Sequence, residues 1–168
     1  VVLFEGWNGA GKGSRISDLM YNLDARATSV YVTEDLDVKA ARSFAGARQG
    51  VTGFYPVMQE FWRALGPRGA ITFYDRGWYT AVIQHMLYNA PAKLLLPKKE
   101  ERHYLDSVHD FEQQLVSDGY VVVKFFVHVG QEAQRKRLER LHDDPATRWR
   151  VSKEKLASVR NYAQAYRL

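Results

Sequence analysis

The sequence feature that most constrains the fold is a glycine-rich segment close to the amino terminus, residues 6–13, which reads GWNGAGKG. It directly follows the apolar run Val1–Phe4, which is typical of a β-strand. A helical pattern comes next, with apolar residues spaced to form one buried helix face: Ile16, Leu19, Met20 and Leu23. A glycine loop between a strand and a helix predicts a specific local structure.

That structure is a binding loop for phosphate. A phosphate needs several backbone N–H donors that converge on one point, followed by a helix N-terminus and a positive charge, here Lys12. The segment matches the G-x-x-x-x-G-K pattern of such loops, although Gly13 stands where a Ser or Thr hydroxyl usually binds magnesium. The sequence predicts the following phosphate-binding residues: Gly9, Ala10, Gly11, Lys12, Gly13 and Ser14.

The rest of the chain predicts an α/β fold. Three further runs rich in β-branched and aromatic residues are expected to be strands, at Ser29–Thr33, Ala70–Tyr74 and Tyr120–Val129. Their continuous hydrophobicity favours a parallel sheet covered on both faces. Helical patterns lie between them, as at Val108, Phe111 and Leu115. We expect one domain over residues 1–168, cut at both ends from a longer protein.

Composition excludes several other classes of protein. The 168 residues are 46% hydrophobic, with no cysteine and no apolar run of membrane-spanning length. This excludes a disulfide scaffold and a thiolate metal site, and it favours the cytoplasm with no membrane partner. The five histidines lack metal-site spacing. Four aromatic residues are expected to line the core or a pocket: Phe61, Trp62, Trp78 and Tyr79.

The positive charge of the chain is concentrated at its carboxyl end. Residues 1–123 carry 13 basic and 14 acidic residues, whereas the last 45 carry 11 and 5, so the net +5 arises there. Such a field attracts a polyanion, although a solvated helix face is the alternative. We interpret residues 131–150 as a lid whose Arg137 and Arg140 neutralise phosphate charge. Little aromatic interleaving argues against nucleic acid as the partner.

A carboxylate and an arginine follow the third expected strand, Asp75 and Arg76. In a parallel sheet this position lies beside the loop after the first strand, where a carboxylate can hold magnesium and an arginine can grip a phosphate oxygen. The alternative is that Asp75 caps the helix that begins near Trp78. The neighbouring glycine-rich loop favours the metal role.

Together these motifs resemble the polyphosphate kinase 2 family. The resemblance runs in order through FEGWNGAGKG at residues 4–13, DRGWY at 75–79, Phe111-Glu112 with Asp118-Gly119, KFFVH at 124–128, and Gln134 through Arg137 to Trp149. It implies a three-layer P-loop kinase-like fold with a helical lid. It also implies transfer of phosphate between inorganic polyphosphate and a nucleotide (AMP, ADP or GDP), Mg²⁺ as cofactor, and a homo-oligomer.

The resemblance also implies roles for residues, and it shows departures. Lys12 and the loop amides would hold the transferring phosphates, Asp75 with Asn8 would position magnesium, and Arg76 would neutralise charge. Family members usually carry Asp where this chain has Asn8, and an amide cannot act as a base or attract magnesium strongly. Gly77 replaces a usual serine, and Thr80-Ala81 stands where an arginine often follows.

Two other functions are compatible with these motifs. A nucleotide kinase of the thymidylate-kinase type also has a related loop and an Asp-Arg pair, but Gly13 and Trp78-Tyr79 argue against it. A non-catalytic domain that binds polyphosphate or nucleotide is suggested by Asn8.

Overall fold

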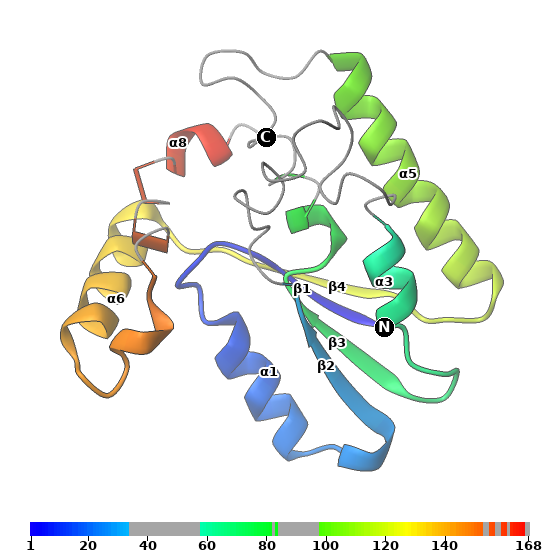
Figure 1. Cartoon of the computed structure of the whole chain (residues 1–168), viewed down its shortest axis with the longest axis horizontal. Helices are drawn as coiled ribbons and strands as arrows, with labels where there is room; N and C mark the ends of the chain where they lie inside the picture. The colour runs from blue at the N-terminus through cyan, green and yellow to red at the C-terminus, as the bar shows by residue number, and fades with distance from the viewer. Residues whose placement is uncertain are drawn as a thin grey trace, which may run out of the picture.

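Four strands form one parallel sheet in the part of the chain that the structure describes. The computed structural model describes residues 1–33, 58–81, 83, 98–152, 155–156, 159–160 and 162–166. In sheet order the strands are β2 (Thr28–Val32), β3 (Ile71–Asp75), β1 (Val2–Gly6) and β4 (Val123–Val127) (Figure 1). Each coincides with or overlaps a strand expected from the sequence, and all three pairings are parallel. The predicted α/β class is confirmed.

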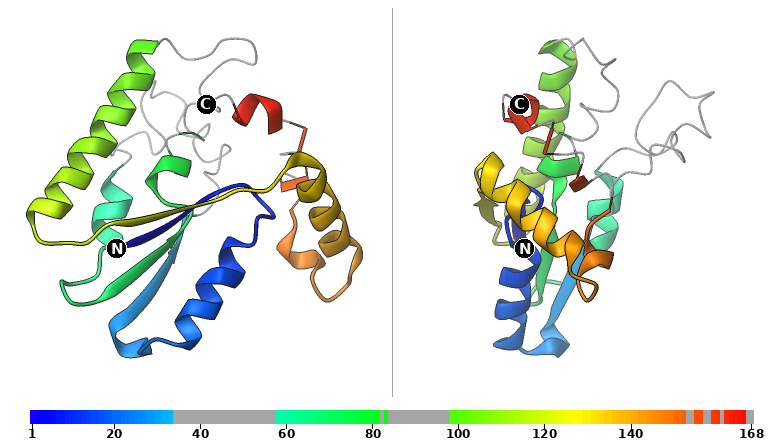
Figure 2. Two further views of the ribbon diagram at one scale, coloured as in Figure 1. Left: turned by 180° about the vertical axis from the view of Figure 1, so that it is seen from behind. Right: turned by 90° about the vertical axis from the view of Figure 1, so that its left-hand side faces the viewer.

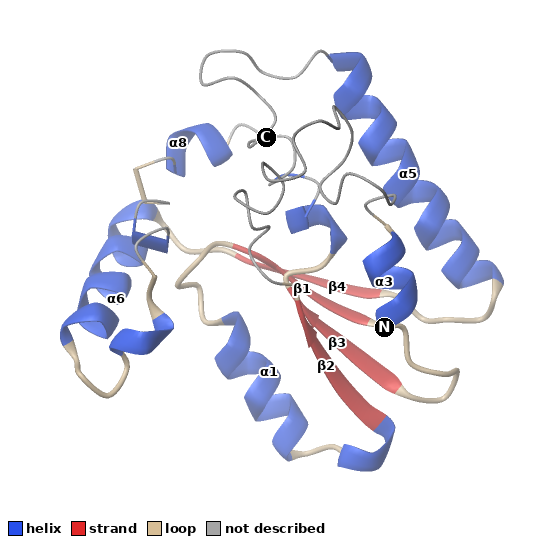
Figure 3. Cartoon of the chain, viewed as in Figure 1, coloured by secondary structure: helices blue, strands red, loops and turns tan. Residues whose placement is uncertain are grey.

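Helices cover both faces of this sheet. Helix α1 (Lys12–Tyr21) lies on one face, and α3 (Gln59–Ala64) and α5 (Lys98–Ser117) lie on the other, which gives three layers (Figures 2 and 3). Helix α6 (Gln131–Asp143) follows β4 and lies beside the loop that leaves β1 (Figure 1). Three short elements complete the described chain: η1 (Ala25–Ala27), η2 (Arg148–Arg150) and α8 (Tyr162–Ala165).

The larger core lies on the α5 face and is rich in aromatic residues. Trp78 is fully buried and packs edge-on against Phe61 and Phe111, with ring centroids 5.7 and 5.0 Å away. Helix α5 contributes Val108, Phe111 and Leu115, as its spacing predicted. Trp62 is 39% exposed yet packs on Phe111 at 4.7 Å, so the expected role of these aromatic residues in the core is largely confirmed.

The α1 face is covered less completely than the sequence suggested. Of the expected buried face of α1, Ile16 is buried, but Leu19 is 41% exposed and Leu23 lies beyond the last residue of the helix. Val32 of β2 and Phe125 of β4 are 51% and 46% exposed. Four strands about 4.8 Å apart are wider than one helix of about 10 Å diameter. The expectation that every strand is covered on both faces is therefore wrong for these edge strands.

A partly buried carboxylate connects the segment after β3 to α5 and β4. Glu112 accepts hydrogen bonds from Trp78 Nε1 and Tyr79 Oη, both at 2.9 Å, and from Lys124 Nζ at 2.8 Å. Burial alone would raise the pKa of Glu112, but these three donors outweigh it and hold the pKa below its ordinary value. This network fixes the helical turn at residues 78–81 on the sheet. Within the described ranges, no helix is both long and apolar enough to cross a membrane.

Candidate phosphate-binding site

The backbone between β1 and α1 requires glycine at its first residue. Gly6 has φ of +111°, and a Cβ there would lie 2.3 Å from the carbonyl oxygen of Val127 in β4. Gly11 has φ of +95° and is the N-cap of α1. An L side chain rarely adopts such φ values, so these glycines let the chain turn sharply from strand to helix. The glycine-rich sequence therefore encodes this turn directly.

The turn leaves several amide groups available to a ligand. Within the described chain, five amides of this segment donate to no acceptor, namely those of Gly9, Gly11, Lys12, Gly13 and Ser14. Those of residues 12–14 belong to the first turn of α1, where N–H groups have no partner inside the helix. The Ala10 amide, also expected to bind phosphate, donates to Trp7 O at 3.2 Å. A cluster of donors at a helix N-terminus is suited to an anion.

Lys12 supplies a positive charge inside the loop. Its Nζ donates to the carbonyl oxygens of Gly6 at 2.9 Å and Trp7 at 3.0 Å, and the residue is only 6% exposed. Burial lowers the pKa of Lys12, while the carboxylates of Asp75 and Glu5 act in the opposite direction. An ammonium group has three donors, so one remains for a ligand after these two contacts.

Strand register brings Asp75 to the same place. Asp75 pairs with Phe4 of β1, and its Oδ2 lies 3.6 Å from the position that a Cβ would take at Gly13. Among the described residues, the Asp75 carboxylate accepts no hydrogen bond and forms no ion pair. Gly13 thus keeps the space beside Asp75 open. A groove of about 510 Å³ runs from these two residues between α1 and β2.

The residue that caps the helical turn after β3 is Glu5, which sequence reasoning missed. Its carboxylate accepts hydrogen bonds from the amides of Tyr79 and Thr80, both at 3.2 Å, and from the Thr80 hydroxyl. Burial raises the pKa of Glu5, and the Thr80 and Tyr79 donors oppose this. The alternative that Asp75 caps this turn is therefore not what the structure shows. A charged residue inside the first strand was the only signal.

Arg76 is held in an unusual backbone conformation. Its φ is +66°, the only positive value among the non-glycine residues described. Thr33 holds both neighbouring carbonyls: its amide donates to Asp75 O at 3.2 Å, and its hydroxyl donates to Arg76 O. Left-handed backbone at a side chain of this size costs about 1–2 kcal/mol and persists where surrounding contacts impose it. Thr33 and Glu5 impose it here, on either side of Arg76.

Helix α6 contacts the outer side of the loop. Gln134 Nε2 donates to Asn8 O at 2.9 Å, and Arg137 Nη1 donates to Gly9 O at 3.4 Å. Leu138 lies 3.3 Å from the Cβ position of Gly9. The structure thus brings Arg137 to the loop, as the lid interpretation requires of its arginines.

Trp7 at the loop tip is held by the carboxyl-terminal part of the chain. Its ring stacks on Tyr162 of α8 at 4.2 Å, and its Nε1 donates to Nδ1 of His128 at 3.1 Å. Tyr162 in turn donates to Val129 O at 2.9 Å. The loop is therefore contacted from outside by residues that follow β4.

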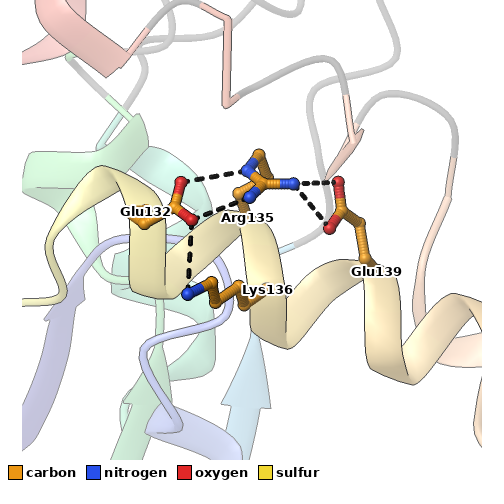
Figure 4. A network of polar contacts seen from close by, with 4 residues as sticks. All are labelled: Glu132, Arg135, Lys136 and Glu139. Atoms are coloured by element: carbon orange, nitrogen blue, oxygen red, sulfur yellow. Dashed lines mark hydrogen bonds and ion pairs between the residues drawn. The ribbon is translucent and has the colours of Figure 1, made fainter.

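Part of the positive charge on α6 is neutralised within the helix itself. Arg135 forms ion pairs with Glu132 at 2.7 Å and Glu139 at 2.9 Å, and Lys136 approaches Glu132 at 3.5 Å (Figure 4). The Arg140 side chain has no such partner in the described part of the chain. Arg137 and Arg140, which the sequence assigned to the lid, are thus free of the helix's own carboxylates.

These features define a class of protein. Strand order β2-β3-β1-β4 places the ends of β1 and β3 at the point where the crossover connections diverge to opposite faces, which is where parallel α/β sheets bind ligands. A glycine loop with the buried Lys12 occupies this point, next to Asp75. The chain is an α/β domain with a glycine loop between its first strand and first helix, the arrangement of P-loop kinase-like folds.

Comparison with known proteins identifies the family. The family model "Polyphosphate kinase 2" matches residues 1–167. A polyphosphate:AMP phosphotransferase of Pseudomonas syringae is 27% identical over 92% of this chain, and NDP-polyphosphate phosphotransferase 3 of Ruegeria pomeroyi is 30% identical over 94%. The structure of polyphosphate kinase 2 from Arthrobacter aurescens superposes on 98% of the chain with a TM-score of 0.77 at 21% identity.

The chain therefore belongs to the polyphosphate kinase 2 family, and the expected P-loop kinase-like fold is confirmed. The matched region covers 28% of the Pseudomonas syringae protein, 47% of the Ruegeria pomeroyi protein and 53% of the Arthrobacter aurescens chain. Kinases of this family generally use a divalent metal.

The strained backbone at Arg76 predicts that the glycine variant is more stable than the alanine variant at this position, the reverse of the usual order in a helix. Arg76→Gly should be more stable than Arg76→Ala by about 1 kcal/mol in urea unfolding, because only Ala retains the steric cost of positive φ. Gln113, exposed in the middle of α5, is the matched control, where Gly should be less stable than Ala by about 1 kcal/mol. The same order at both positions would show that Arg76 is unstrained.

Proposed function

We propose that the protein transfers phosphoryl groups between inorganic polyphosphate and a nucleoside mono- or diphosphate. The observation that carries this proposal is the cluster of five unpaired amides around the buried Lys12, next to Asp75. The relatives named above, which act on polyphosphate and nucleotides, support the same substrate classes. The cytoplasmic location and the homo-oligomer expected from the sequence belong to this proposal.

The roles of individual residues follow from their positions. The loop amides and the remaining donor of Lys12 bind oxygens of the transferring phosphates. Arg76, Arg137 and Arg140 neutralise the charge that spreads over those oxygens in the transition state. The contact of Arg137 with Gly9 supports this role, and so does the held backbone of Arg76. Positioning and charge neutralisation provide most of the catalysis in phosphoryl transfer. Residues 131–150 form the lid.

Mg²⁺ fits the donors that the site offers. Within the described ranges, no group of three or more His, Asp or Glu side chains is placed to hold a metal by itself. Mg²⁺ is commonly bound by one or two carboxylates together with substrate phosphates and water, and Asp75 supplies one such carboxylate beside the loop. We assign Asp75 as the metal ligand, and Asn8 as a residue that helps to position the ion. The bound ion would shield charge on the phosphates.

Asn8 favours one alternative, a domain that binds polyphosphate or nucleotide without turnover. The amide of Asn8 stands where relatives usually carry a carboxylate, and it attracts a cation only weakly. The backbone at Asn8 is anchored by Gln134, so binding through the loop amides does not depend on the lost charge. Binding and transfer are therefore separate properties, and each needs its own measurement.

The main prediction concerns Lys12. Incubation with polyphosphate, Mg²⁺ and AMP, ADP or GDP should produce new nucleotide phosphates, measured by chromatography. Lys12→Ala should lower kcat/KM by about 100-fold or more, because a charge-assisted contact to the transferring phosphate is lost. Arg26→Ala, a fully exposed cation at η1, should have no effect. No turnover with any acceptor would reject transfer, and unchanged phosphate affinity in Lys12→Ala would reject the loop as the site.

The two kinds of arginine on α6 should behave differently. Arg137→Ala should weaken binding of inorganic tripolyphosphate by about 3- to 10-fold, measured by calorimetry, because its guanidinium lies at the loop. Arg135→Ala removes the same charge two residues away, but Glu132 and Glu139 already neutralise it. Its affinity should change less than about twofold. Equal losses in both variants would indicate a diffuse field instead of a defined contact.

Restoring the carboxylate tests the alternative function. Asn8→Asp should raise the transfer rate at saturating substrate by about tenfold or more, equivalent to about 1.4 kcal/mol of added charge stabilisation. Asn8→Ala, which adds no charge, is the control. A rise from no measurable activity would identify the wild-type protein as a binding domain. A rate that is unchanged or lower in Asn8→Asp would contradict a metal-positioning role for residue 8.

A further inference from the structure

We propose that Gln134 is a positioning residue that sets the direction of the Gly9 amide in the phosphate loop. This inference rests on the proposed function, because it concerns how the same loop binds polyphosphate. Gln134 belongs to α6, and its side chain is 1% exposed, although most of this helix is charged and solvent-exposed. A buried carboxamide loses its contacts with water, so it is retained where it makes a specific contact.

That contact is with the backbone of the loop. Gln134 Nε2 donates to the carbonyl oxygen of Asn8 at 2.9 Å. The peptide unit that joins residues 8 and 9 is planar and trans, so its C=O and its N–H point in opposite directions. A donor that holds the Asn8 carbonyl toward α6 therefore directs the Gly9 N–H away from α6. This N–H is one of the unpaired donors of the site.

Only the donor half of the Gln134 carboxamide is used. Its Oε1 is buried and accepts no hydrogen bond in the described part of the chain. A buried acceptor without a partner destabilises the fold, so stability alone does not explain a carboxamide at this position. An apolar side chain of similar size would remove the unpaired oxygen together with the donor. Such a substitution therefore separates the contribution of Gln134 to the stability of the fold from its contribution to the geometry of the loop.

Neighbouring residues on α6 complete the arrangement. Arg137, one turn further along, donates to the carbonyl of Gly9. On the other side of the loop, Lys12 binds the carbonyls of Gly6 and Trp7. Side chains therefore hold all four consecutive carbonyls of residues 6–9. The loop amides are fixed before a ligand binds, and this preorganisation lowers the cost of binding.

The test uses Gln134→Met in the full chain, with Leu138→Met as the matched control on the same face of α6. Three measurements are made: the melting temperature, the affinity for inorganic tripolyphosphate, and the hydrogen exchange rate of the Ala10 amide. The Ala10 amide reports the loop without any ligand because it donates to Trp7 O at 3.2 Å. If Gln134→Met has a lower melting temperature than the wild type, Gln134→Leu is used in its place.

We expect the melting temperature of Gln134→Met to stay close to that of the wild type, because an unpaired acceptor is lost together with the donor. Tripolyphosphate should bind about 3- to 10-fold more weakly, and the Ala10 amide should exchange about tenfold faster. The KM for polyphosphate should rise, while the KM for the nucleotide stays constant. Leu138→Met should change none of these quantities by more than about twofold.

Two results would overturn the role of Gln134. One is an unchanged Ala10 exchange rate together with unchanged tripolyphosphate affinity in the Gln134 variants. The other is a loss that tracks the melting temperature equally in the Gln134 and Leu138 variants, which would indicate a packing role. Failure of the proposed function can be distinguished from failure of this inference. If the wild-type protein transfers no phosphate, the exchange rate of the Ala10 amide still tests the role of Gln134.

Discussion

The site depends on the register of β1, the strand that lies between β3 and β4. Phe4 pairs with Asp75 of β3, and Gly6 pairs with Val127 of β4, so three chain segments leave the sheet at one edge. They carry the phosphate loop, the Asp75-Arg76 pair and the connection to α6. A slip of β3 by one residue would move Asp75 by about 3.3 Å and turn it to the other face of the sheet. Backbone hydrogen bonds of the sheet thus position the chemical groups before any side chain contributes.

Local conformational preferences and hydrophobic patterns explain which parts of this arrangement can be predicted from the sequence. The loop and the strands are encoded by glycine conformation and by contiguous apolar runs, and Asp75 by its place at the end of such a run. Gln134, Glu5 and Thr33 are different. Gln134 meets its loop partner across 126 positions and Glu5 meets Thr80 across 75, so no local pattern reveals these contacts, although both residues lie in runs that carry the family resemblance. The exposure of the edge strands β2 and β4 was also not predicted, because an apolar strand has the same sequence pattern whether or not a helix covers it.

Part of the positive charge in the carboxyl-terminal segment is neutralised by contacts within that segment, which composition alone does not show. Its excess of basic residues suggested an anionic partner, but Arg135 and Lys136 engage Glu132 and Glu139 on the same helix. These exposed pairs contribute little to stability, yet they reduce the field on one side of α6. The opposite side presents Gln134, Arg137 and Leu138 to the loop. The spacing of charges around the helix, and not their number alone, therefore decides which side of α6 carries positive charge that its own carboxylates do not neutralise.

Two of the departures from the family pattern, at positions 77 and 8, have different physical meanings. A Cβ at Gly77 would lie 2.6 Å from Leu3 Cδ2 and 2.8 Å from Glu5 Oε1, so glycine there is matched to the packing of the buried Glu5. The change at position 77 is thus compensated within the fold. No comparable steric reason requires Asn at position 8. Gln134 donates to the backbone carbonyl of this residue, and that contact does not depend on the side chain at position 8. Replacing Asp by Asn at this position therefore alters the electrostatics of the site while leaving the loop geometry in place.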